Sequence, residues 1–143
     1  MNYSYLKLSL QIAAILQVTI ALLNLKLDRI MGWQEDMKRM PLLIREVHVV
    51  HSWFVSLTLA IFAVMTWRFA PEFARASSEP CCWLTASIGI FWGFRTVLQV
   101  CYYSSGHWRG QTGRTVIHIA ALLIYGGFTL AYLSAAFGIG ATR

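Results

Sequence analysis

The sequence has few charged residues, and the charges that it has are unevenly placed. Charged residues make up 13% of the 143 residues, which is about half of the usual share in a soluble domain. The basic residues, which give a net charge of +6, lie at the ends of apolar runs and form no stripe with interleaved aromatic residues. This distribution argues against a disordered chain and against nucleic-acid binding, and it is typical of a membrane protein.

Cysteine pairs with metal-binding spacing and the common catalytic motifs are also missing. Cys81 and Cys82 are adjacent and Cys101 stands alone, so the chain has no CxxC framework. The sequence contains no GxSxG, no HExxH and no glycine-rich phosphate loop. Nor does it repeat a pair of broken apolar segments, as secondary transporters do. These absences leave an electron-transfer or binding subunit without independent catalysis as the main functional expectation.

Hydrophobic residues, in contrast, are abundant, at 57% of the chain. They gather in four runs, each long enough to cross ~30 Å of hydrocarbon as a helix. The first run exceeds the h-region of a signal peptide and is followed by no clear cleavage site, so we interpret it as a retained span. The expected spans are residues 6–27, 41–69, 82–103 and 114–137.

Short connections between the spans predict an all-α integral membrane protein, with four antiparallel transmembrane helices in one up-down-up-down bundle. The first and third loops then share one membrane face. Seven basic residues lie on that face against four on the other, which favours the cytoplasmic side for it. We expect the chain in a bacterial inner membrane. The seven residues are Lys26, Arg29, Lys38, Arg39, Arg45, Arg109 and Arg114.

The ionisable residues inside the spans gather toward this same face. An ionisable residue inside a span is by default a hypothesis of function. Helical periodicity places Arg45 and His48 on one inward stripe, with His51 about 60° away from it. Three further inward stripes carry Arg95 with Gln99, His118 with Tyr125, and Asn24 with Asp28. The candidate binding residues are Arg45, His48, His51, Arg95, Gln99, Arg114 and His118.

Two histidines on facing helices predict a b-type haem, because imidazole is a common axial ligand of haem iron. We expect His118 and His51 to hold the iron, with His48 as a substitute, and we expect arginines to neutralise the propionates. Glycines of the last two spans could make room for the flat ring, namely Gly89, Gly93, Gly126 and Gly127. The general plan is similar to that of membrane b-type cytochromes, which implies electron exchange with a quinone or a partner redox subunit.

Three other interpretations of the same residues stay open. A non-haem metal could use His48, His51 and His118, completed by Glu46, Asp28 or His107. A quinone or a lipid headgroup could take hydrogen bonds from a histidine and Arg95 without any metal. In a purely structural interpretation the chain is an accessory subunit of a larger membrane complex, Arg95 pairs with an acid such as Asp28, and the interfacial histidines lie among headgroups.

Overall fold

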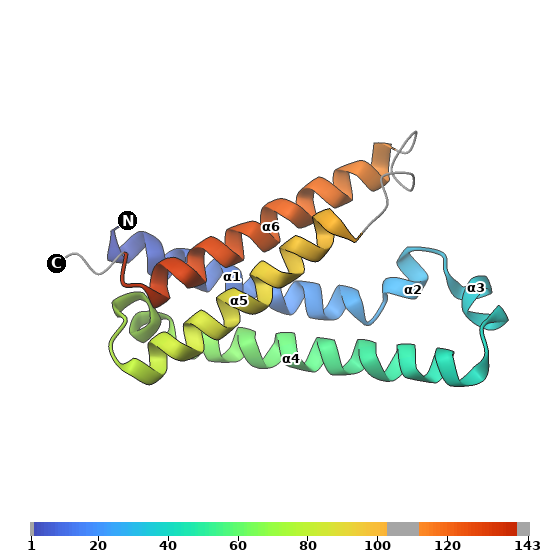
Figure 1. The fold of residues 1–143 in the computed structure, drawn as a ribbon, viewed down its shortest axis with the longest axis horizontal. Coiled ribbons are helices and arrows are strands. Elements are labelled where there is room, and N and C mark those ends of the chain that lie inside the picture. Colours follow the sequence, from blue (N-terminus) through green and yellow to red (C-terminus); the bar gives the residue numbers. More distant parts are fainter. Residues whose placement is uncertain (1, 103–111, 140–143) are drawn as a thin grey trace. The chain divides into compact units, whose positions relative to one another are not determined.

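The computed structural model describes residues 2–102 and 112–139, without the side chains of Thr112 and Arg114. Every regular element in this described part is helical (Figure 1). The elements are α1 (Tyr3–Asn24), α2 (Leu27–Ile30), α3 (Gln34–Arg39), α4 (Leu42–Arg75), α5 (Glu79–Cys101) and α6 (Thr112–Ala136).

Four of these helices are long and apolar enough to cross a membrane. The hydrophobic runs form helices because a segment in lipid must satisfy its own backbone hydrogen bonds. Many serine and threonine hydroxyls within the spans also find a partner inside their own helix, because each donates a hydrogen bond to the backbone carbonyl four residues earlier. The residues with such a bond are Ser9, Thr19, Ser56, Thr58, Thr85, Ser87, Thr96 and Thr129.

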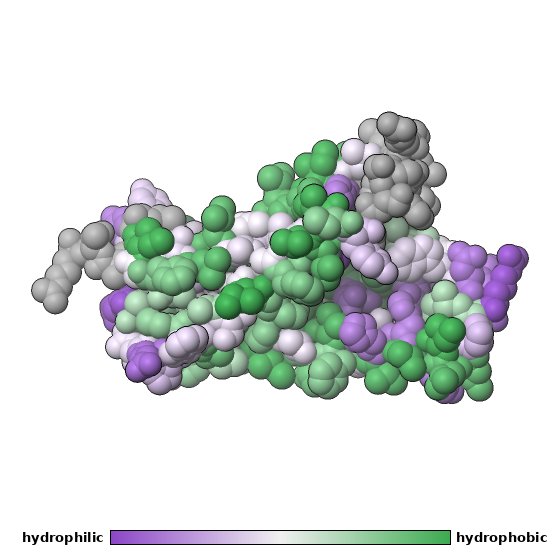
Figure 2. All heavy atoms as spheres, viewed as in Figure 1, coloured by the Kyte–Doolittle hydropathy of each residue, from purple (hydrophilic) through white to green (hydrophobic). Residues whose placement is uncertain are grey.

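The polar segment between the first two spans forms the short helices α2 and α3. Gly32 joins them with a φ of +71°, a backbone conformation that favours glycine. Hydrophilic residues gather around α3, whereas green apolar side chains predominate along α4 (Figure 2). Two exposed side chains of α3, Lys38 and Glu35, pair at 2.7 Å, a geometry that contributes little at a surface.

Helix α4 extends past the end that its sequence suggested. The second span was expected to end at residue 69, but helical structure continues to Arg75. The backbone at Phe69 is non-helical, with φ −111° and ψ 17°. Proline lacks a backbone N–H and clashes with the preceding turn, so it ends one helical segment and suits the first turn of the next. The chain therefore kinks at Phe69 and adds one further helical turn before α5.

This kink is also where the chain divides into two compact units. Unit one consists of Met1–Leu10 and Phe69–Arg143, and unit two of Gln11–Arg68. In unit one, α5 packs against α6, with Ile88, Trp92, Phe128 and Tyr132 buried. Gly89, early in α5, lies near Leu133, late in α6, whereas Gln99, late in α5, lies near His118, early in α6. The two helices are therefore antiparallel. In unit two, the end of α1 contacts the beginning of α4 in the same antiparallel sense.

Candidate functional site

In unit one, three polar side chains form a hydrogen-bonded chain between α5 and α6. Arg95 donates from Nη1 to Oε1 of Gln99, at 2.8 Å. The amide Nε2 of Gln99 lies 2.9 Å from Nδ1 of His118. Arg95 and His118 are half-buried, and Gln99 is only 6% exposed. Helix α5 carries Arg95 and Gln99 on one face because they are four residues apart, and the antiparallel α6 brings His118 to them.

An aromatic cluster adjoins this polar chain. Trp92 stacks on Tyr125 with ring centroids 5.2 Å apart, and it meets the edge of Phe128 at 4.7 Å. The guanidinium of Arg95 lies over the same Tyr125 ring, 5.0 Å from its centroid. Trp92 is 2% exposed, and its indole Nε1 has no hydrogen-bond partner among the described residues. The cluster thus combines flat apolar surfaces with a buried donor and a cation.

The four glycines that were expected to make room for a ring do not behave alike. A Cβ at Gly89 would lie 2.8 Å from Leu133, and one at Gly93 would lie 3.3 Å from Thr129. These two positions serve the close approach of α5 and α6. At Gly126 and Gly127 a Cβ would meet no described atom within 4 Å. Of the four glycines that were expected to make room for a ring, only Gly126 and Gly127 therefore leave space among the described atoms.

A second polar cluster lies in unit two, where the end of α1 and the short helix α2 face the beginning of α4. Asn24 donates from Nδ2 to the carbonyl oxygen of Ser52 at 3.0 Å and to Oγ of Ser56 at 2.9 Å. Asp28 pairs through Oδ1 with Nε2 of His48, at 3.1 Å. Both members of this pair keep about a third of their side-chain surface exposed, at 36% and 37%. The inward stripes expected on these two helices therefore contact each other.

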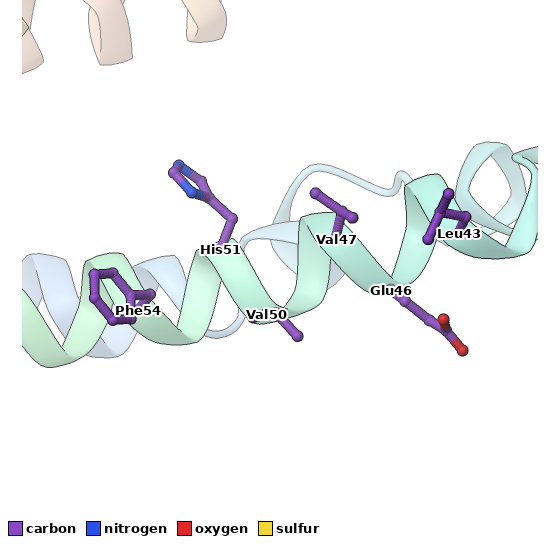
Figure 3. Close-up of a pocket in the computed structure, with 6 residues that line it drawn as sticks. All are labelled: Leu43, Glu46, Val47, Val50, His51 and Phe54. Carbon is purple, nitrogen blue, oxygen red and sulfur yellow. The ribbon is translucent and has the colours of Figure 1, made fainter.

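His51 lies on a different, exposed face of α4. It contributes to a shallow, mostly apolar surface, and its imidazole points to the opposite side of the helix from Glu46 (Figure 3). With the other described residues His51 forms no hydrogen bond or ion pair. Arg45 is half-buried two turns earlier. The surface is lined by Leu43, Glu46, Val47, Val50, His51 and Phe54.

Some candidate residues fall outside the description. Arg114 belongs to α6, but its side chain is not among those described, and His107 lies outside the described residues. Among the described residues, no three His, Cys, Asp or Glu side chains are grouped to hold a metal ion. The pairing of His51 with His118 joins two units and stays a prediction.

The analysis of the sequence missed Trp92 and the contacts of Asn24. Trp92 lies three residues before Arg95 and shares its face of α5. That spacing was the available signal for the aromatic cluster. Asn24 was placed on an inward stripe, but its hydrogen bonds to Ser52 and Ser56 were not predicted.

By length and composition of its helices, the protein falls in the class of helical membrane proteins. Its exposed apolar side chains are compatible with contact with a lipid bilayer. Comparisons with protein-family models, with curated proteins and with solved structures find no match. The function must therefore be argued from the site itself.

Proposed function

We propose that the protein is a membrane electron-transfer subunit that holds one b-type haem and exchanges electrons with a quinone or a partner protein. In this proposal the two helical hairpins join as an up-down-up-down bundle in a bacterial inner membrane, with the histidine-bearing end on the cytoplasmic face. His118 and His51 ligate the iron, with His48 as the substitute. The propionates are neutralised by Arg45, Arg95 and Arg114.

The observation that carries this proposal is the chain of Arg95, Gln99 and His118 within two apolar helices. A cation inside a span costs about 2.5–3.5 kcal/mol on insertion scales, so its retention favours a role. Metal-ligating histidines are usually oriented by a hydrogen bond at their second ring nitrogen. Gln99 lies at that nitrogen of His118, Nδ1; because a ligating histidine donates from this nitrogen, the Gln99 amide would have to turn its oxygen toward it when haem binds. The stacked rings of Trp92 and Tyr125 offer apolar surface for a macrocycle beside the cation.

A quinone is the second candidate, and two observations favour it. Nε1 of Trp92 is a buried donor without a partner among the described residues, and such a donor fits a ligand carbonyl. Gln99 also donates to Nδ1 of His118, which leaves the ring proton on Nε2. A quinone headgroup has two carbonyl acceptors on a flat ring, and a carbonyl could accept from Nε1 of Trp92 or from Nε2 of His118.

The test is an absorption spectrum of the protein purified in detergent after expression with adequate haem supply. The spectrum is recorded oxidised and after dithionite reduction, with metal analysis of the same sample. We expect a sharp reduced α band and about one iron per chain, both abolished by His118→Gln and by His51→Gln. Because His48 is the substitute ligand, it is no neutral control; Thr58→Val, which removes only a hydrogen bond within α4, serves as the matched control and should retain the band.

Each other outcome contradicts the haem proposal in a different way. A colourless sample with stoichiometric zinc, copper or iron would indicate a non-haem site. A colourless, metal-free sample that releases a quinone on solvent extraction would support the second candidate. A sample without any bound cofactor that purifies with stoichiometric partner subunits would indicate an accessory subunit.

A further inference from the structure

The orientation of the Gln99 amide determines which nitrogen of His118 carries the proton. A guanidinium has donors only, so the atom of Gln99 that faces Arg95 must be the oxygen. The amide nitrogen then faces His118, and an amide nitrogen also only donates. Nδ1 of His118 must therefore be the acceptor. A neutral imidazole has one proton, and it lies on Nε2.

Reversing the amide would place its NH2 group against the guanidinium, with donor facing donor. Gln99 is 6% exposed, so little water is available to relieve that contact. Arg95 is in turn held by the face of Tyr125, 5.0 Å from the ring centroid, which is a favourable place for a cation. The amide orientation is thus fixed from the Arg95 side.

We infer that Arg95 sets the tautomer of His118 through Gln99, and thereby decides whether Nε2 donates a hydrogen bond or offers a lone pair. Both residues are positioning residues for His118. A carboxylate that takes the hydrogen bonds of Arg95 releases Oε1 of Gln99. The amide can then rotate and accept from Nδ1–H, while the ring exchanges its Nε2 proton for one on Nδ1 and keeps one proton in total.

This inference rests on the proposed function only where the ligand is a haem. A haem carries both groups that the arrangement requires, namely carboxylates for Arg95 and an iron for the lone pair of Nε2. Haem binding through His118 would then require that a propionate engages Arg95. In its ligand-free form His118 carries its ring proton on Nε2, which is the tautomer that can donate from Nε2 to a quinone carbonyl.

The test reads the tautomer directly, by 15N NMR of the full chain labelled at histidine and reconstituted without ligand in nanodiscs. Protonated and unprotonated ring nitrogens give well-separated resonances, and the spectrum of His118→Gln identifies the signals of His118 by difference. We expect the Nε2–H tautomer in the wild type. We expect Arg95→Lys to retain it, because lysine is also a donor without an acceptor.

Two variants should change the tautomer. Gln99→Glu places a carboxylate between Arg95 and His118, and a carboxylate only accepts, so His118 should convert to Nδ1–H. Arg95→Met removes the donor that fixes the amide, so the single Nε2–H signal should be lost in favour of both tautomers. A wild type in the Nδ1–H form, or an Arg95→Met variant that keeps only Nε2–H, would overturn the inference. If one variant fails to fold, the wild type and the other still decide.

Haem affinity provides an independent readout. Substituting the hydrogen-bond partner of a metal-ligating histidine commonly changes the affinity for the metal on the order of 10–100-fold. Gln99→Glu supplies an acceptor for Nδ1–H and should tighten haem binding by a factor in that range. A wild type with the Nε2–H tautomer and no haem under any loading condition contradicts the proposed function and leaves the inference standing. A wild type that binds haem but carries the proton on Nδ1 when ligand-free would support the proposed function and contradict the inference about the tautomer.

Discussion

Replacing Gly89 by alanine should weaken the packing of α5 on α6. The added Cβ would lie 2.8 Å from Cδ2 of Leu133, 3.0 Å from its Cγ and 3.2 Å from Cβ of Tyr132. The Cδ2 atom belongs to a flexible side chain and can move, but Cβ of Tyr132 is fixed to the backbone of α6. The helices must therefore separate slightly. Overpacking of this kind typically costs about 1–3 kcal/mol.

Gly126→Ala provides the matched control, because it is the same substitution in an apolar helix without a described atom within 4 Å of the new Cβ. Alanine is favoured over glycine in a helix by about 0.8–1.0 kcal/mol, and this gain applies to both variants and cancels in their difference. We therefore expect Gly89→Ala to be about 1–3 kcal/mol less stable than Gly126→Ala. Gly93→Ala, with its Cβ 3.3 Å from Thr129, should fall between them.

The measurement is equilibrium unfolding of the purified variants in mixed micelles with a rising fraction of SDS, followed by circular dichroism. The expected difference corresponds to a factor of roughly 5 to 150 in the unfolding equilibrium constant. Equal stability of Gly89→Ala and Gly126→Ala, or a more stable Gly89→Ala, would refute the close approach of α5 and α6 at this point.

Two further substitutions test the polar contacts of unit two. Asn24→Leu removes both hydrogen bonds to α4. It should lower the free energy of unfolding by about 0.6–1.7 kcal/mol, the range of interhelical hydrogen bonds in membranes. Thr19→Val removes only a bond within α1 and should cost less, so equal losses would contradict the interhelical contact. Asp28→Asn removes the charge that faces His48. Because the pair is about one-third exposed, the free energy of unfolding should change by only about 0–1 kcal/mol. A larger loss in the same unfolding assay would show that the pair is shielded from water.

The sequence predicted the helices well because hydrophobic length alone determines them. Residues 6–27 were expected where α1 covers Tyr3–Asn24, and residues 82–103 where α5 covers Glu79–Cys101. The ends shifted by a few residues because polar residues such as Glu79 can begin a helix beyond the apolar run. The largest shift, at the end of α4, came from Pro71, which permits a new helical turn where the span was expected to end.

Helical phase also indicated which face of each helix these side chains occupy. Asp28, His48, Gln99 and His118 were each placed on an inward stripe, but their partners were not predicted: in one interpretation Arg95 was paired with an acid such as Asp28, whereas Asp28 contacts His48 and Arg95 contacts Gln99. The orientation of the Gln99 amide could not be foreseen, because it depends on a donor four residues away whose position is set by Tyr125 on another helix. Periodicity gives the face of a side chain and not the direction of its hydrogen bonds.

The three candidate histidines differ in the hydrogen bonds of their ring nitrogens, and this difference decides how well each could serve as a ligand. His48 uses Nε2 for Asp28, so it would have to break that pair or coordinate through Nδ1. His51 keeps both nitrogens out of hydrogen bonds with described residues, so no contact fixes its ring before a ligand binds. Among the histidines that the structure describes, only His118 has its Nδ1 held by a buried side chain that is itself fixed. In the proposed haem or quinone site the ligand would therefore depend first on His118, and the choice between iron and a carbonyl oxygen would depend on the residue behind it, Gln99.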